Sequence, residues 1–289
     1  MTENGNLPAV DDPCGDFPES LSNDDVIEFV HTEAVELTHP LDPGPFARHE
    51  GVPAHDQDLL KGSRIAIAGA GGLGGWIAVA LARSGAGTIT VIDPDLIETS
   101  NLSRQFFTAA DRGKPKGPRL ARNLADQAPG GINVTGIGLS FDEAIQKYTI
   151  PADLIIAGVD NNECRMQILL EARKRRIPAI FSMLSRDGMR CHVFLQNASP
   201  FEPCIWCALP NLDVRRSMPC ASAIVSSCFL TASLTVFFAH RALTGWGDLV
   251  PFNWREADLS GRAPDRVGTV QKRRNCVCSE INGGCVVVD

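Results

Sequence analysis

Residues 64–75 read Arg-Ile-Ala-Ile-Ala-Gly-Ala-Gly-Gly-Leu-Gly-Gly, an apolar run that passes directly into a cluster of glycines. A short continuous apolar run is typical of a strand that is buried on both faces of a parallel sheet. Residues 76–82 contain strong helix formers and are followed by Gly85 and Gly87, which suit the end of a helix. This order of strand, glycines and helix predicts the start of a doubly wound α/β fold.

Later apolar runs indicate the same fold class. Residues 88–93, 154–158 and 179–182 predict further buried strands, and residues 190–195 suit a later, antiparallel one. Because strands joined through helices make right-handed crossovers, we expect a Rossmann-like, mostly parallel sheet flanked by helices.

The glycine cluster is a candidate phosphate site. Gly69, Gly71 and Gly74 give the pattern GxGxxG between a predicted strand and a predicted helix, where backbone amides can approach phosphates. Asp93 ends the next predicted strand and is placed to accept hydrogen bonds from ribose hydroxyls. These features alone fit a nicotinamide or flavin dehydrogenase as well as an ATP-using enzyme.

The segment after Asp93 separates these two classes. It carries Asp95, then Asn101-Leu102-Ser103-Arg104-Gln105, then Gly113-Lys114-Pro115-Lys116, and finally Asp160-Asn161 followed by Arg165. With these motifs, residues 45–280 resemble the activating enzymes of ubiquitin-like proteins, including the ThiF and MoeB activators of bacterial sulfur carriers. The resemblance implies an enzyme that uses ATP and Mg²⁺ to adenylate a carboxylate.

The resemblance also implies roles for single residues. Asn101, Arg104 and Lys116 would contact the triphosphate, and Asp160 would help to hold Mg²⁺. Cations suit this step because a carboxylate and the α-phosphate, both anions, must meet while pyrophosphate leaves; solvated surface charges are the alternative interpretation. Arg48 fits an arginine that reaches the triphosphate of the partner subunit in the family's homodimers. The predicted nucleotide site comprises Gly69, Gly71, Gly72, Gly74, Asp93, Asp95, Asn101, Arg104, Gln105, Lys116, Asp160, Asn161 and Arg48.

Two pairs of cysteines predict a metal site. Cys204 and Cys207 form a CxxC pair, and Cys276 and Cys278 form a CxC pair close to residue 289. Two separated thiolate pairs are the usual ligands of a tetrahedral structural Zn²⁺, which would pin the C-terminal tail to the domain. A redox pair or free thiols are the alternative, and Cys285 could replace one of the CxC ligands.

Cys220 is the candidate nucleophile. It precedes the uncharged stretch 221–239, and Arg215 and Arg216 nearby favour the reactive thiolate. This region resembles the activating enzyme of the ubiquitin-fold modifier, which implies a thioester on Cys220; a buried, inert thiol is the alternative. Four other cysteines are interpreted as structural: Cys14, Cys164, Cys191 and Cys228.

The charge distribution divides the chain. The net charge is −7, but residues 1–45 hold eleven acidic residues and no lysine or arginine, so the remainder carries +4. This balance disfavours a nucleic-acid partner. We expect an acidic N-terminal arm over residues 1–45, either solvated or docked as a short element, an adenylation domain over 46–245, and a loop with a cysteine-bearing tail over 246–289. Residues 246–275 are rich in polar residues, Gly and Pro and predict an irregular connection.

Two segments were weighed as membrane or export signals. Residues 221–239 carry no charge, but their serines and threonines favour a buried helix over a membrane span. The first residues lack a basic start and an apolar run, so we expect a cytoplasmic protein with reduced cysteines.

Together these features predict ATP-dependent adenylation of the C-terminal glycine of a ubiquitin-like protein, thioester formation on Cys220 and transfer to a conjugating enzyme. Activation of a sulfur carrier, adenylation of a peptide and a non-catalytic partner subunit remain as alternatives.

Overall fold

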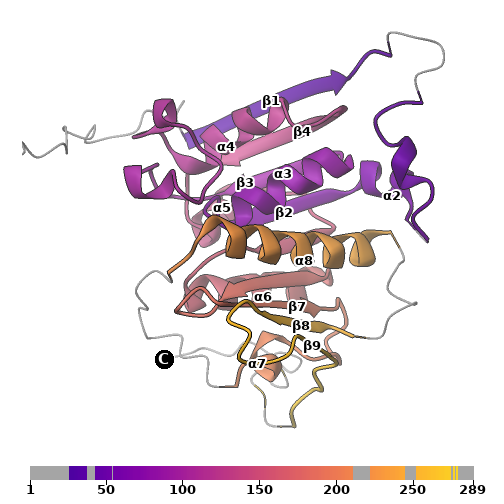
Figure 1. The fold of residues 1–289 in the computed structure, drawn as a ribbon, viewed down its shortest axis with the longest axis vertical. Helices are drawn as coiled ribbons and strands as arrows, with labels where there is room; N and C mark the ends of the chain where they lie inside the picture. The colour runs from indigo at the N-terminus through magenta and orange to yellow at the C-terminus, as the bar shows by residue number, and fades with distance from the viewer. Residues whose placement is uncertain are drawn as a thin grey trace, which may run out of the picture.

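The computed structural model describes residues 26–37, 43–53, 55–210, 222–244 and 252–274, together with Cys276 and Cys278. Within these residues a single sheet has the strand order β1-β4-β3-β2-β5-β6-β7-β8-β9. Figure 1 shows this sheet running the length of the molecule, from β1 at the top to β9 near the bottom.

The middle of the sheet is parallel. It consists of β2 (Arg64–Ala68), β3 (Thr88–Ile92), β4 (Gly130–Ile137), β5 (Leu154–Ala157) and β6 (Ala179–Leu184). From β2 the chain builds outward on one side through β3 and β4, and on the other side through β5 and β6. The order therefore reverses between β2 and β5, the position where ligands of such sheets bind.

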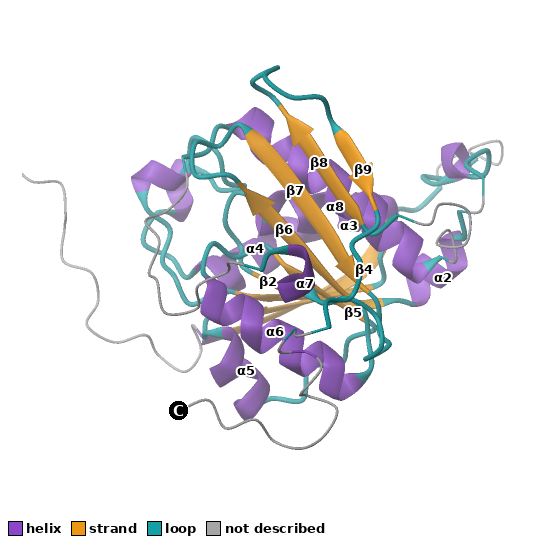
Figure 2. Ribbon diagram, turned by 90° about the horizontal axis from the view of Figure 1, so that it is seen from below, coloured by secondary structure: helices purple, strands orange, loops and turns teal. Residues whose placement is uncertain are grey.

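Helices cover both faces of the sheet, as Figure 2 shows from below. Ile65 and Ile67 of β2 pack on one side, against α3 (Gly74–Ser84), α4 (Lys116–Ala125) and α8 (Val225–Leu243). Ala66 and Ala68 face the other side, against α5 (Phe141–Lys147), α6 (Asn162–Arg175) and α7 (Ile205–Ala208). Both faces are buried, which explains why the strands read as continuous apolar runs.

Antiparallel strands extend the sheet at both ends. β1 (Ile27–Ala34) pairs with β4, and an ion pair between Glu28 and Arg122 of α4 holds it in place. The described part of the acidic arm is therefore a docked strand, one of the two forms that its sequence allows.

β7 (Arg190–Gln196) is antiparallel to β6, as predicted, and β8 (Trp254–Asp258) and β9 (Arg266–Gly268) follow. The prediction that residues 246–275 are irregular is wrong for these two strands, whose backbones join the sheet despite their polar residues. Strands from all three predicted segments thus lie in one sheet.

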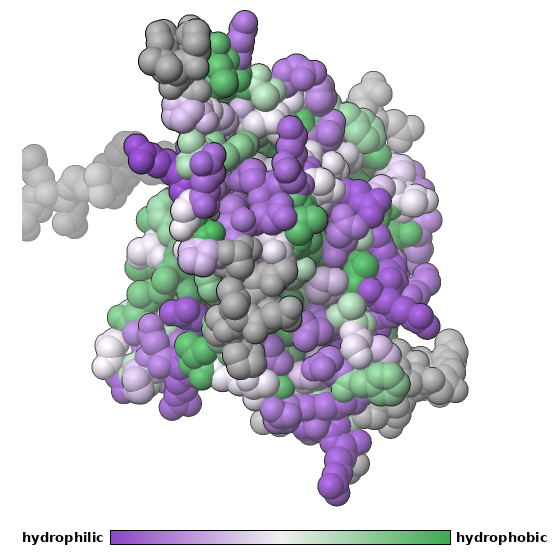
Figure 3. Space-filling model, turned by 90° about the vertical axis from the view of Figure 1, so that its right-hand side faces the viewer, coloured by the Kyte–Doolittle hydropathy of each residue, from purple (hydrophilic) through white to green (hydrophobic). Residues whose placement is uncertain are grey.

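The uncharged stretch forms the buried helix α8. Its threonines hydrogen-bond within the helix, Thr231 to Ser227 O and Thr235 to Thr231 O, both at 2.8 Å, and Thr235 also bonds Ser182 of β6 at 2.7 Å. No helix in the described part of the chain is long and apolar enough to cross a membrane. The side seen in Figure 3 accordingly mixes hydrophilic residues with smaller hydrophobic areas.

Three histidines join α8 to the segment before β2. The His55 ring lies 5.2 Å from His49 and 5.3 Å from His240, between centroids, and Gln57 of α2 (Gln57–Gly62) bonds His49 and His55. Nε2 of His240 is buried and has no partner among the described residues. Burial and the two neighbouring histidines lower the pKa of His240 from 6.5 to about 4.

This histidine cluster predicts acid sensitivity. Because the pKa of His240 is lower in the folded than in the unfolded chain, the unfolded state binds more protons between pH 6.5 and 4. Stability should therefore fall through that window, by up to about 3 kcal/mol. Urea denaturation at pH 7 and pH 5 would measure the fall. It should shrink in His240→Gln but not in His31→Gln on β1; an equal fall in both variants would contradict the assignment.

Candidate active site

Three glycines meet at the switch point between β2 and β5. Gly69 has φ +94°, and a Cβ there would lie 2.7 Å from the carbonyl oxygen of Gly158, which follows β5. A Cβ on Gly74, the first residue of α3, would overlap the carbonyl oxygen of Gly69. Only glycine permits this approach, which brings the N-terminus of α3 against the ends of two strands. The predicted phosphate loop is therefore present as a tight turn.

Asp93 fixes the loop from the neighbouring strand. Its carboxylate accepts the backbone N–H of Ala70 at 2.6 Å and that of Asp95 at 2.9 Å. Burial raises the pKa of Asp93, and the nearby Lys116 ammonium opposes this shift. The side chain thus holds two turns together and stays beside the glycine loop.

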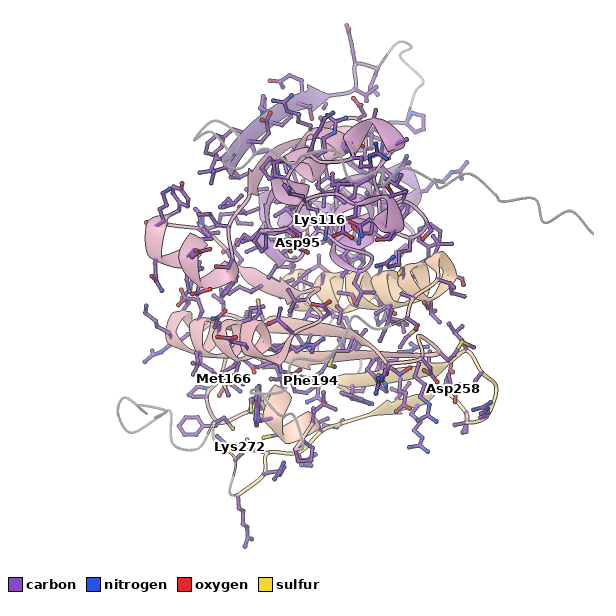
Figure 4. The ribbon with its side chains drawn as sticks, turned by 90° about the vertical axis from the view of Figure 1, so that its left-hand side faces the viewer. Asp95, Lys116, Met166, Phe194, Asp258 and Lys272 are labelled. Atoms are coloured by element: carbon purple, nitrogen blue, oxygen red, sulfur yellow. The ribbon has the colours of Figure 1, made fainter. Side chains whose placement is uncertain are left out.

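Lys116 and Asp95 form an ion pair at this end of the sheet. The Lys116 ammonium lies 2.8 Å from Asp95 Oδ2, and the Lys116 backbone N–H donates to Asp95 O at 2.9 Å. The lysine side chain is 9% exposed whereas the aspartate side chain is 65% exposed. Figure 4 shows the two side chains together in the upper half of the molecule. Asp95 therefore fixes the position of the Lys116 ammonium, and the Asp95 carboxylate itself faces solvent.

Asn101 ends the short helix η2 (Thr99–Asn101), and Arg104 and Gln105 lie on the turn that follows it. Asn101 is buried and accepts the Glu98 N–H at 3.0 Å, so it shapes this turn. The Arg104 guanidinium donates to Ser100 O at 2.7 Å. Gln105 is buried beside Gly71, and its Oε1 accepts no hydrogen bond from the described protein. The motif thus supplies a cation and a buried amide next to the glycine loop.

Asp160 and Asn161 follow β5 and lead into α6. Asn161 caps the helix by accepting the Cys164 N–H at 2.8 Å. Arg165 is buried under this turn and donates to Val159 O at 2.6 Å. Burial lowers the pKa of Arg165, and the charge of Asp160 acts in the opposite direction. Asp160 is exposed at the same edge of the sheet as the glycine loop.

Asp111 supports the site and was not singled out from the sequence. It is fully buried and accepts the N–H and hydroxyl of Thr108, at 2.8 and 2.9 Å, and Nε of Arg119. Burial alone would raise the pKa of Asp111, but these hydrogen bonds lower it. A buried carboxylate with this many donors fixes the loop that carries Lys116, between η3 (Ala109–Asp111) and α4. A cavity of about 420 Å³, lined by Arg104, Arg119 and Trp76 among others, adjoins it.

Two predicted residues are not brought to this site. Arg48 lies in the short helix η1 (Ala47–His49), and the adjacent Phe46 packs on Gly85 and Gly130, at the opposite ends of α3 and the parallel strands from the glycine loop. Within one chain Arg48 therefore does not join the other nucleotide residues. Cys220 lies outside the described residues.

The four cysteines predicted as ligands come together. Sulfur separations are 3.9 Å for Cys204 and Cys207, 3.6 Å for Cys204 and Cys276, and 3.8 Å for Cys207 and Cys278. All four sulfurs lie within 4.8 Å of one another and the residues are buried. A tetrahedron with bonds of about 2.3 Å has edges of about 3.8 Å, so the cluster fits Zn²⁺. In this cluster the CxC pair takes the place of a second CxxC.

Comparisons with known proteins identify the family of this chain. A family model described as the ThiF family matches residues 46–279. The chain belongs to the ThiF family. Curated relatives are named Ubiquitin-like modifier-activating enzyme 5. That of Drosophila grimshawi is 28% identical over 246 residues, 77% of this ThiF-family chain and 61% of the relative. That of Drosophila mojavensis is 30% identical over 217 residues, 67% and 53% of the two chains. The chain thus spans about half to three fifths of these relatives.

Solved structures share the fold. E. coli MccB with MccA-N7isoASN has a TM-score of 0.69 at 19% identity, covering 82% of this chain and 74% of that chain. E. coli MccB with ATP has a TM-score of 0.67 at 21% identity, covering 83% and 75%. PaaA has a TM-score of 0.61 at 23% identity, covering 75% and 67%. At these identities the likeness establishes the fold alone.

The glycine loop packs against α8 through Gly72 and Cys228, so substitutions at these two positions should have coupled effects on stability. A Cβ on Gly72 would lie 2.9 Å from the buried sulfur of Cys228, so Gly72→Ala should destabilise the fold by about 1–3 kcal/mol. Cys228→Ala removes the obstructing sulfur. The double variant should lose at least 0.5 kcal/mol less, on the order of measured couplings between contacting residues, than the sum of the two single losses in urea denaturation. Strict additivity would show that the loop does not rest on Cys228.

Proposed function

We propose that this chain uses ATP to adenylate the C-terminal glycine carboxylate of a ubiquitin-like protein. The observation that carries this proposal is the buried Lys116, aimed by Asp95 beside the glycine loop, with Arg104 on the adjoining turn. Membership of the ThiF family and the names of the relatives support the same activity. A dehydrogenase would have no use for this pair of cations.

The proposed reaction is in-line transfer of AMP. A carboxylate oxygen of the carrier attacks the α-phosphorus of ATP, the new P–O bond forms, and the bond to pyrophosphate breaks. Backbone amides at the N-terminus of α3 would hold phosphate oxygens. Lys116 and Arg104 would offset the repulsion between the carboxylate and the phosphate, then the charge on pyrophosphate. Each carboxylate oxygen of Asp93 accepts one backbone hydrogen bond, and the remaining lone pairs would accept hydrogen bonds from the ribose hydroxyls.

Mg²⁺, when bound, would neutralise negative charge on the phosphates. Asp160 suits this ion because it is an exposed carboxylate at the carboxyl end of β5, with the buried Arg165 and the capping Asn161 fixing its turn. Gln105, whose buried oxygen has no partner among the residues that the structure describes, offers one further hydrogen-bond acceptor beside Gly71.

The remaining parts of the proposal concern the later step and the assembly. Zn²⁺ would be held by Cys204, Cys207, Cys276 and Cys278, where it would pin the tail. The Cys220 thiolate would attack the acyl carbon of the adenylate, so that a thioester bond forms, the bond to phosphate breaks and AMP leaves; the carrier would then pass to a conjugating enzyme. We include a homodimer, because Arg48 lies at the opposite end of α3 from the glycine loop of its own chain and would serve the nucleotide site of a second copy.

A second candidate is adenylation of a peptide. The observation that favours it is the fold shared with MccB, a microcin C7 biosynthetic enzyme solved with N-formylated MccA and separately with ATP. The same cations and glycine loop would serve either carboxylate.

Exchange of labelled pyrophosphate into ATP tests the proposal. With Mg²⁺ and ubiquitin-like proteins ending in glycine, we expect exchange that depends on the carrier. Lys116→Met should lower its rate by about 10²–10³-fold, because an electrostatic contact of the transition state is lost. Asp160→Ala should abolish exchange, whereas the exposed Asp58→Ala on α2 should leave it unchanged. Cys220→Ala should retain exchange but form no thiol-sensitive carrier adduct.

The alternatives give different results in the same assay. Exchange supported by short peptides and by no carrier would establish the second candidate. Nucleotide binding without exchange for either substrate class would refute adenylation. Carrier-dependent exchange followed by normal carrier transfer in Cys220→Ala would leave adenylation intact and remove the thioester step.

A further inference from the structure

One buried cation lies beside the cysteine cluster rather than beside the nucleotide residues. Arg173 is in the last turn of α6 and is 8% exposed. Within the described part of the chain its guanidinium donates only to backbone carbonyls, those of Asn197 at 3.0 Å, Glu202 at 2.8 Å, Pro203 at 3.1 Å and Ser199. Among the described residues no carboxylate lies within ion-pair distance of it.

A buried guanidinium without a counter-ion is costly. Taking a charge out of water costs several kcal/mol unless an opposite charge offsets it, and carbonyl oxygens supply only partial charges. Two kinds of full charge lie nearby: the cysteines, since the Pro203 carbonyl that Arg173 binds immediately precedes Cys204, and the exposed Glu202 carboxylate, which acts on Arg173 less strongly than the cysteines do. Burial lowers the pKa of Arg173, and the charges of Cys204, Cys278 and Cys207 oppose that shift.

The cysteine cluster has the complementary problem. Zn²⁺ with four thiolates carries a net charge of −2, and this cluster belongs to a hydrophobic core that includes Ile205 and Phe194. Two other cations are near. Lys272, labelled at the lower end of Figure 4, bonds Pro200 O at 2.6 Å, and Arg273 bonds Trp206 O at 3.2 Å. Arg273 is exposed and Lys272 half-buried, so water screens them more than it screens Arg173.

We propose that Arg173 is the buried counter-charge of the metal–tetrathiolate cluster and a positioning residue for its ligands. This inference rests on the zinc site proposed above. The positive charge stabilises the dianionic cluster, while the guanidinium ties the segment before the CxxC pair to α6. Removing the positive charge leaves the same four ligands, but the electrostatic potential then stabilises the dianionic cluster less, so the metal should bind more weakly.

The neighbouring lysine provides a matched control. Arg173 begins the basic run Arg173-Lys174-Arg175-Arg176 at the end of α6, where cations usually offset the helix dipole. The Lys174 side chain is 80% exposed and pairs with Glu171. It has the same charge and nearly the same place in the helix as Arg173, without access to the cluster.

The experiment measures metal affinity on the full chain, with no reference to activity. Zn²⁺ binding is determined by competition with a chromophoric chelator, and Co²⁺ is used to report tetrahedral thiolate ligation by its absorption bands. Arg173→Gln should bind zinc about 10–100-fold more weakly, as is usual when an outer partner of a metal site is removed. Lys174→Gln should keep the wild-type affinity.

The variant Arg173→Lys separates the effect of the charge from that of the hydrogen bonds. It also replaces Arg173→Gln as the test if that variant does not fold. It retains the positive charge but loses the planar fork that reaches several carbonyls, so zinc affinity should stay within about threefold of wild type. A tenfold loss of zinc affinity in Arg173→Lys, equal to the loss in Arg173→Gln, would overturn the proposal that Arg173 acts through its charge. It would show that Arg173 acts only through its hydrogen bonds to the carbonyls.

The failure of the zinc site and the failure of this inference are distinguishable. If the wild-type chain gives no tetrahedral thiolate spectrum with Co²⁺, the metal site itself is wrong and the inference falls with it. If the wild type binds and Arg173→Gln binds equally well, only the role of Arg173 is refuted.

Discussion

The contact of Gly69, Gly74 and Gly158 is the constraint on which the rest of the site depends. These backbones touch where β2, α3 and β5 meet, so the helix begins directly over the point at which the strand order reverses. Everything proposed to bind nucleotide is arranged around this contact. A side chain at any of the three positions would separate the helix from the sheet, and the amides of the loop would no longer share one side with the ends of the strands.

Three aspartates hold the segments around that glycine contact in place, and they differ in burial. Asp93 is buried and holds two backbone turns, Asp111 is buried and holds the approach to Lys116, and Asp95 is exposed and holds the lysine itself. The two buried ones are satisfied by several donors, as buried charges must be. The exposed one costs little to leave charged, because water solvates it.

The sequence predicted the parts of this arrangement that depend on local patterns. The glycine loop, Asp93 and the cysteine pairs were predicted from short-range spacings of strands, glycines and ligands, whereas Lys116 was predicted from the resemblance to the activating enzymes. β1 and β9, at the two edges of the sheet, and the partly buried β8 beside β9 were missed or left open because these strands are polar and lack the apolar run of a strand buried on both faces. Asp111 and Arg173 were also missed. Among many charged residues, only tertiary packing shows which ones lose contact with water.

The outer strands also make the time course of folding uneven. Ile65 pairs with Ile89 of β3 only 24 residues away, whereas Ile27 of β1 pairs with Ile137 of β4, 110 residues away. Closing the longer loop costs about 1.3 kcal/mol more chain entropy, and β1 gains contacts on one edge only. The β2–β3 and β5–β6 pairs can therefore form between neighbours in sequence. The β1–β4 pair, like the central β2–β5 pair that joins Ile65 to Leu154, 89 residues away, adds long-range contacts of the kind that slow folding.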